Sequence, residues 1–150
     1  MPTQTDYLNL SQAVYTTGGA TPVAPSGWTL LQSETLPSGM QAAAFQNTIT
    51  HEIVISYEGT NLNNMTSNFS LLFEQLSADA AIANGVNPQA NIDALNFAGK
   101  VAGSAGGNPI YVTGHSLGGE EAEYVQAHGA ANGLIISGGD LPCFFGPRLT

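Results

Sequence analysis

The chain has 150 residues, 43% of them hydrophobic, and this length and composition suit one globular domain with a core of its own. Only 9% of the residues are charged, and a formal net charge of −9 leaves two basic side chains, Lys100 and Arg148. This balance argues against nucleic acid as a partner and disfavours anionic membrane surfaces, because almost nothing could neutralise phosphates.

The cellular compartment is left open by the sequence. Cys143 is alone, so no intramolecular disulfide can form, which fits a cytoplasmic protein and also a secreted bacterial one without disulfides. The first residues, Met1–Asp6, carry no basic stretch and no apolar run of the kind found in secretory signal peptides. No apolar run elsewhere is long enough to span a bilayer.

The N-terminal third predicts a helix followed by a hairpin. Asp6–Tyr15 is expected to be a short helix. Its apolar side chains fall on one face: Tyr7, Leu10 and Val14. Trp28–Gln32 and Met40–Gln46 predict two strands, because turn residues separate them, and we expect a hairpin at one edge of a sheet.

The middle of the chain predicts a buried strand and two helices. Ile53–Tyr57 is nearly continuous and β-branched, which is typical of a strand buried on both faces of a parallel sheet. Thr66–Ala83 has the spacing of an amphipathic helix, and Pro88 begins another. The apolar stripe expected on this second helix comprises Ile92, Leu95, Ala98 and Val101 or Ala102. Both stripes are expected to serve core packing.

A glycine-rich hexapeptide, Gly114–Gly119, follows the predicted strand Ile110–Thr113 and precedes a helical pattern over Glu120–His128. Strand, sharp turn and helix form the context that a G-x-S-x-G nucleophile elbow requires, with Ser116 at the tip of the turn. The Leu117 N–H would then open the helix and point at the developing oxyanion. The alternative is a glycine-rich turn with an ordinary serine.

The last predicted strand is Leu134–Ser137, with Gly138–Asp140 at its carboxyl end. The alternation of strands and helices predicts an α/β fold with a parallel sheet. Ligands of such sheets bind at the carboxyl ends of the strands. The candidate site segments at these ends are Glu58–Asn61, His115–Leu117 and Gly138–Asp140.

Two segments, Ile53–Thr60 and Val112–Gly119, resemble the class 3 lipases of the α/β-hydrolase superfamily and the lipase-type modules of large secreted bacterial proteins. The resemblance covers roughly residues 50–130 and implies an α/β-hydrolase-type, mostly parallel sheet with flanking helices. The chain departs from the family at Glu58, where a basic residue is usual, and at Glu120 and Glu121, where small or apolar residues are usual.

The resemblance implies that Ser116 is the nucleophile and that the Leu117 N–H is one oxyanion donor. Thr60 would be the other donor, through its N–H and its hydroxyl, and each such donor is typically worth ~3 kcal/mol of transition-state stabilisation. Thr60 could instead be a simple turn residue.

A catalytic base is not evident in the sequence. His128 falls at the far end of the elbow helix, His51 precedes its strand, and His115 should be turned aside by the elbow. Asp140 is either the triad acid or a turn-forming residue after two glycines. The family usually places its acid and histidine further along the chain, so we expect a single incomplete hydrolase domain over residues 1–150, its N-terminal portion.

Other polar groups predict no cofactor. Glu120, Glu121 and Glu123 are expected to form a solvated face of the elbow helix. No cluster has metal-ligand spacing, and Gly103–Gly107 lacks the pattern of a phosphate-binding loop.

The resulting hypothesis is a serine hydrolase of the lipase/esterase class that acts on carboxylic esters through an acyl-Ser116 intermediate. Its partner is an ester or lipid substrate, and a homo-oligomer is left open. Lipase, esterase, thioesterase and peptidase are not distinguished. The alternative is a catalytically incompetent fragment, or a non-enzymatic binding module that keeps the elbow fold.

Overall fold

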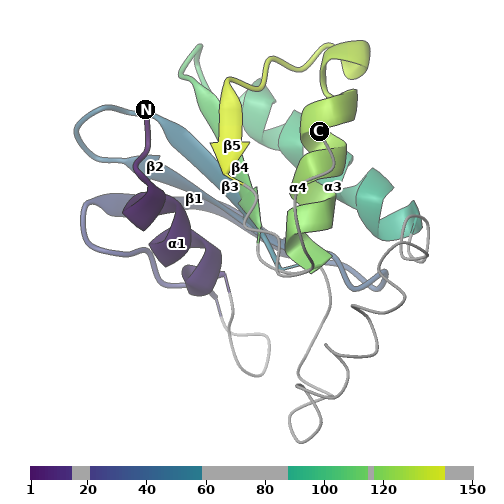
Figure 1. Ribbon diagram of the computed structural model, residues 1–150, viewed down its shortest axis with the longest axis horizontal. Coiled ribbons are helices and arrows are strands. Elements are labelled where there is room, and N and C mark those ends of the chain that lie inside the picture. Colours follow the sequence, from purple (N-terminus) through teal and green to yellow (C-terminus); the bar gives the residue numbers. More distant parts are fainter. Residues whose placement is uncertain (15–20, 59–87, 115–116, 141–150) are drawn as a thin grey trace, which may run out of the picture.

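The computed structural model describes residues 1–14, 21–58, 88–114 and 117–140, with the backbone alone at Pro88, Leu117, Gly118, Glu120 and Asp140. A five-stranded sheet in the order β1-β2-β3-β4-β5 carries α1 on one face and α3 and α4 on the other (Figure 1). In chain order the elements are α1 Gln4–Ala13, β1 Trp28–Thr35, β2 Gln41–Asn47, β3 Ile53–Tyr57, α3 Pro88–Gly103, β4 Ile110–Gly114, α4 Leu117–His128, a 3₁₀ turn Ala130–Asn132 and β5 Gly138–Asp140.

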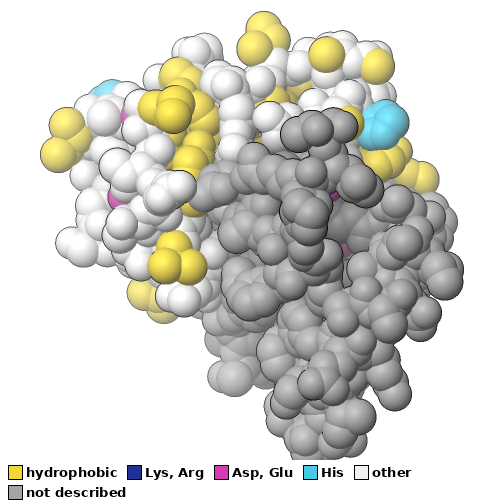
Figure 2. Space-filling model, viewed as in Figure 1, with side chains coloured by type: hydrophobic (Ala, Val, Ile, Leu, Met, Phe, Trp, Pro, Cys, Tyr) yellow, Lys and Arg dark blue, Asp and Glu magenta, His cyan; other side chains and the backbone are white. Residues whose placement is uncertain are grey.

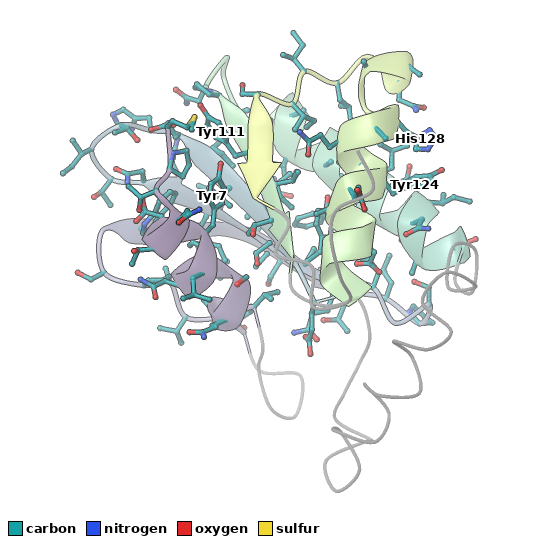
Figure 3. All side chains as sticks on the ribbon, in the orientation of Figure 1. Tyr7, Tyr111, Tyr124 and His128 are labelled. Atoms are coloured by element: carbon teal, nitrogen blue, oxygen red, sulfur yellow. The ribbon has the colours of Figure 1, made fainter. Side chains whose placement is uncertain are left out.

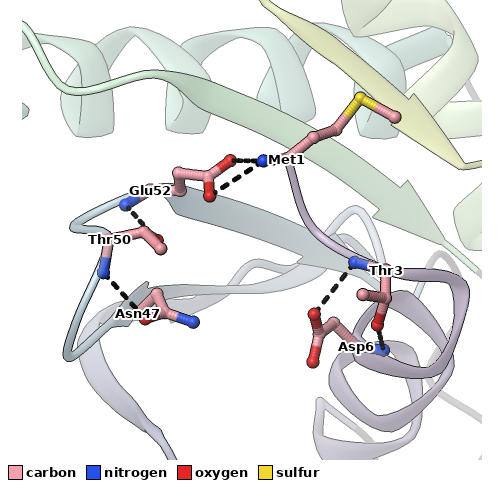
Figure 4. Close-up of polar contacts among 6 residues, drawn as sticks. All are labelled: Met1, Thr3, Asp6, Asn47, Thr50 and Glu52. Carbon is pink, nitrogen blue, oxygen red and sulfur yellow. Dashed lines mark hydrogen bonds and ion pairs between the residues drawn. The ribbon is translucent and has the colours of Figure 1, made fainter.

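Helix α1 begins two residues earlier than predicted because Thr3 caps it. The Thr3 hydroxyl accepts from the Asp6 N–H at 3.1 Å, and the Asp6 carboxylate accepts from the Thr3 N–H at 2.9 Å (Figure 4). This reciprocal pair is a capping box. Tyr7 and Leu10, with Val14 just beyond the helix, are buried against the sheet as predicted.

The predicted hairpin is confirmed at the β1 edge of the sheet. Strands β1 and β2 pair antiparallel, from Trp28 opposite Asn47 to Thr35 opposite Gln41. Gly39 adopts a φ of 94° in the connecting turn, a conformation that glycine takes without a steric penalty. Strand β2 continues antiparallel into β3, so the N-terminal part of the sheet is a meander.

The two central strands confirm the predicted parallel pair. Strand β3 lies parallel to β4, from Ile53 opposite Ile110 to Tyr57 opposite Gly114. All five residues of β3 are buried, as their continuous apolar run predicts, because α1 covers one face and α3 with α4 cover the other.

The last strand corrects the prediction. Residues 134–137 are not a strand, and Ile135 is 85% exposed. The strand is Gly138–Asp140, and it pairs parallel with β4. A Cβ on Gly139 would overlap the Val112 carbonyl oxygen, so this close approach to β4 depends on glycine. Close approach, rather than β-propensity, sets the position of the strand.

The buried stripe of α3 confirms the prediction at Ala98 and Val101 and differs from it at Ile92. Ile92 is 45% exposed and Leu95 is only partly buried. The residues of α3 in the core are Ala90, Ala94, Phe97, Ala98 and Val101. Helix α3 packs mainly against α4, and Ile92 falls outside its buried face. The predicted helix Thr66–Ala83 lies outside the described residues.

Candidate active site at the carboxyl edge of the sheet

Three strand ends meet at one edge of the sheet, as expected for the site. Tyr57 at the end of β3 pairs with Gly114 at the end of β4, and Thr113 of β4 pairs with Asp140 at the end of β5. Glu58 follows β3 directly. The carboxyl edge of a parallel sheet is where α/β proteins bind ligands, so this edge is the candidate site.

The predicted strand–helix junction is confirmed around the G-x-S-x-G motif. Strand β4 ends at Gly114 and α4 begins at Leu117, so the helix opens at Leu117 as expected, three residues before the helical pattern at Glu120. The N–H groups in the first turn of a helix have no partner within the helix, so the Leu117 N–H is placed to donate outward. Ser116 and Thr60 lie outside the described residues, and the predicted convergence of Thr60 and Leu117 on Ser116 stays a prediction.

Glu58 is a buried carboxylic acid at this edge. Its side chain is 4% exposed, and its backbone N–H donates to the Gln41 carbonyl oxygen at 2.8 Å. Within the described part of the chain, its Oε2 atom is buried and has no hydrogen-bond partner. Burial raises the pKa of Glu58 to about 7, because an apolar environment disfavours the charged form.

Glu121 corrects the prediction that the acidic start of α4 is a solvated face. Its side chain is 3% exposed, whereas that of Glu123 is exposed. Position 121 lies four residues before Val125 and beside Ala122, both fully buried, so it belongs to the inner face of the helix. The spacing of Glu121 from these two apolar residues was the signal in the sequence for its burial. For Glu120 the structure describes the backbone alone.

Tyr57 links the sheet edge to helix α3 behind it. Its hydroxyl donates to the Ala94 carbonyl oxygen of α3 at 2.8 Å, and its ring meets Phe97 edge-on at 6.5 Å between centroids. Burial and the nearby charge of Glu121 raise the pKa of Tyr57 well above its usual value. Tyr57 therefore stays a neutral donor that fixes the end of β3 against α3.

The described histidines lie away from the carboxyl edge, as predicted. His128 ends α4, is exposed, and lies beside Tyr124 with ring centroids 4.2 Å apart (Figure 3). His51 is exposed in the turn before β3, at the opposite edge of the sheet. His115 lies outside the described residues. Among the described residues, no group of three or more His, Cys, Asp or Glu side chains could hold a metal ion.

The opposite edge of the sheet holds an ion pair. The Met1 ammonium lies 2.9 Å from a carboxylate oxygen of Glu52 (Figure 4).

On the face seen in Figure 2, uncharged side chains dominate the described surface. Lys100 pairs with Glu34 at 2.6 Å, and it is the sole Lys or Arg in the described part of the chain. None of the described helices is long and apolar enough to cross a membrane.

Comparison with protein-family models finds no match, and no curated protein matches the sequence. Among solved structures, the nonglycosylated LIP2 lipase of Yarrowia lipolytica aligns with a TM-score of 0.52 and 16% identity, over 90% of this chain and 54% of that one. A crystal structure of the Lip2 lipase from Yarrowia lipolytica aligns with a TM-score of 0.49 and 19% identity, over 85% of this chain and 52% of that one. The lipase from Rhizopus microsporus var. chinensis aligns with a TM-score of 0.40 and 15% identity, over 75% of this chain and 44% of that one.

The fold is therefore of the α/β-hydrolase type: a mixed five-stranded sheet with flanking helices, similar to that of a fungal lipase. The chain spans about half the length of the lipases it matches. At this level of identity the likeness concerns the fold, and the narrower class 3 resemblance stays a prediction.

Proposed function

We propose that the chain is a serine hydrolase of the lipase/esterase class, acting on carboxylic esters, including lipid esters, with Ser116 as nucleophile. The observation that carries the proposal is the junction of β4 and α4, where a G-x-S-x-G sequence leaves the carboxyl edge of an α/β-hydrolase-type sheet. This is the position at which such folds expose a reactive serine.

The proposed reaction passes through an acyl-enzyme. The Ser116 oxygen attacks the ester carbonyl carbon, the N–H groups of Leu117 and Thr60 stabilise the oxyanion, and the alcohol leaves. Water then hydrolyses the acyl-serine. Asp140, at the end of β5, is the proposed acid, but none of the described histidines lies near it, so the Ser116 proton passes to water and turnover is slow.

The test combines covalent labelling with ester turnover by the purified chain. We expect a fluorophosphonate probe to label the protein, Ser116→Ala to abolish labelling, and Ser137→Ala, at an exposed serine before β5, to leave it unchanged. Hydrolysis of a short p-nitrophenyl ester should be weak or undetectable. Without a complete triad, the rate acceleration over the reaction in water falls to a residual ~10³–10⁴-fold. Labelling that persists in Ser116→Ala would refute the proposal.

A binding module without turnover is the second candidate function. The observation that favours it is that no described imidazole lies at the carboxyl edge. Fast ester turnover that disappears in Ser116→Ala would exclude this candidate. It would also show that a histidine, from this chain or a partner subunit, reaches the serine.

A further inference from the structure

The C-terminal end of α1 is held by side chains of the sheet. The helix ends at Ala13 without a glycine and has no basic residue in its last turn. The last carbonyl groups of a helix have no partner within the helix, so their donors come from elsewhere. The Ser56 hydroxyl donates to the Leu10 carbonyl oxygen at 2.9 Å, and the Gln41 side-chain amide donates to the Val14 carbonyl oxygen at 3.0 Å.

Glu58 lies beside these two donors on the same face of the sheet. Its N–H donates to the Gln41 carbonyl oxygen at 2.8 Å, which extends the β2–β3 ladder by one residue pair. Side chains alternate along a strand, so Glu58 follows Ser56 on the face that α1 covers. Glu58 is 4% exposed, and within the described residues its Oε2 atom is buried without a hydrogen-bond partner. A buried carboxyl group therefore adjoins the residues that hold the end of α1.

The surroundings oppose a negative charge on this carboxyl group. The carbonyl end of a helix is the negative end of its dipole, and a carboxylate near it is unfavourable. Lys100, the sole Lys or Arg among the described residues, belongs to α3 on the other face of the sheet. The Met1 ammonium is paired with Glu52 at the opposite edge. Burial raises the pKa of Glu58 to about 7.

The other titratable groups near this face supply no positive charge to Glu58. Gln41, its neighbour on β2, is uncharged. The groups that α1, β4 and β5 contribute are carboxyls and phenols: Asp6, Tyr7, Tyr111 and, described by its backbone alone, Asp140. An ionised Glu58 would therefore be a buried charge without a counter-ion, which is costly unless water reaches it.

We propose that Glu58 is a pH-sensitive switch for α1: the helix is docked on the sheet while the carboxyl group is protonated, and loss of the proton releases the C-terminal half of the helix. The proton passes to solvent, and water that enters beneath the helix hydrates the carboxylate. Release uncovers the apolar side chains that α1 packs against, which include Trp28, Phe45 and Val54. The switch does not depend on the proposed ester hydrolysis.

The direction of the switch follows from proton binding. The Glu58 carboxyl group titrates near 4.5 when exposed and near 7 when buried, so the docked state holds the proton more tightly than the released state. Between these two values, rising pH favours the released state, and above pH 7 the effect is complete.

The experiment follows α1 by amide hydrogen exchange between about pH 5 and pH 9, in wild type and in Glu58→Gln, whose side chain is uncharged at every pH. The ratio of the exchange rates of the same α1 amides in the two proteins cancels the intrinsic effect of pH on exchange. We expect this ratio to rise with pH by between about 10-fold and about 100-fold. Wild type alone, corrected for intrinsic exchange, should show a rise of the same size.

A low, non-denaturing concentration of urea separates local release from global unfolding. Local opening exposes little surface, so the exchange of α1 amides at about pH 8 should not respond to urea. Amides of β4 exchange by global unfolding and should exchange faster as urea is added. The control variant is Glu123→Gln, which removes an exposed carboxylate of α4 and should match wild type within about twofold at each pH.

Three results would overturn the proposal. A ratio that stays constant with pH would show that Glu58 does not control the docking of α1. If α1 amides respond to urea in step with those of β4, the titration acts on the whole fold and α1 is not released by itself. A pH dependence that persists in Glu58→Gln and disappears in Asp140→Asn would assign the titration to the other carboxyl group.

Discussion

Gly139 of β5 lies so close to Val112 of β4 that a Cβ would overlap the Val112 carbonyl oxygen and press on its side chain. The edge of the sheet beside the candidate nucleophile is therefore set by a residue without a side chain. Asp140, the proposed acid, is the next residue, so its position depends on this contact.

Gly139→Ala is expected to lower the free energy of unfolding by about 1–3 kcal/mol, since overpacking against backbone forces β5 to shift. The measurement is urea unfolding followed by circular dichroism. Gly99→Ala is the matched control, because no atom lies within 4 Å of its added Cβ in the middle of α3. In that control the free energy of unfolding should rise by about 0.5–1 kcal/mol. A stability gain in both variants would contradict the close approach of β5.

Tyr57→Phe is expected to reduce stability by about 1 kcal/mol, because it removes the hydrogen bond to the Ala94 carbonyl oxygen while keeping the ring against Phe97. Tyr124→Phe, at a half-exposed position on α4, serves as control and should change stability by less than about 0.5 kcal/mol. Urea unfolding at pH 7 measures both. An unchanged midpoint for Tyr57→Phe would show that this bond contributes nothing.

Glu58 makes the stability of the protein depend on pH. Its carboxyl group titrates near 4.5 when exposed and near 7 in the folded chain. Between these values the folded state binds more protons than the unfolded state, so the free energy of unfolding falls as pH rises through this window. The loss amounts to about 3 kcal/mol at most. Below pH 4.5 both states carry the proton and the effect is absent.

Glu58→Gln removes this titration, so its stability relative to wild type should increase from pH 5 to pH 8. Urea unfolding of both proteins at several pH values gives the difference directly, and titrations that they share cancel. A difference that is constant with pH would mean that Glu58 is ionised in the folded protein throughout this range.

His128→Ala should leave fluorophosphonate labelling of Ser116 within about twofold of wild type. His128 ends the helix that Leu117 begins, about 17 Å along its axis at 1.5 Å per residue, and its ring lies beside Tyr124. The assay is the one that tests Ser116 itself. A tenfold slower reaction in a folded His128→Ala variant would show that this imidazole reaches a serine, in the same chain or in a second copy.

Elements with strong local signals could be predicted from the sequence. The continuous β-branched run Ile53–Tyr57 and the turn between Trp28 and Met40 identify a buried strand and an edge hairpin. The parallel β3–β4 pair and the strand–helix junction at Gly114 follow from the same reasoning. These elements place the candidate site segments at the carboxyl edge of the sheet.

The remaining features depend on tertiary packing. Strand β5 forms at glycines, which have low β-propensity, because only glycine can lie so close to Val112. The buried face of α3 includes Ala90, Ala94 and Ala98, and it is set by packing that is mainly against α4. The burial of Glu58 has no local signal, since a carboxylate is normally exposed unless the fold encloses it, whereas the spacing of Glu121 from Ala122 and Val125 does indicate an inner position.

The parallel register of β3 and β4 has a consequence for folding kinetics. Thr35 and Gln41 pair across a short turn, whereas Ile53 and Ile110 pair across 57 positions of chain. Closing the longer loop loses more chain entropy before any contact is gained, and non-local pairings of this kind slow folding. The β1–β2–β3 meander can therefore form first and serve as the template on which β4 docks. The carboxyl edge of the sheet would then be completed last, at the rate of that docking step.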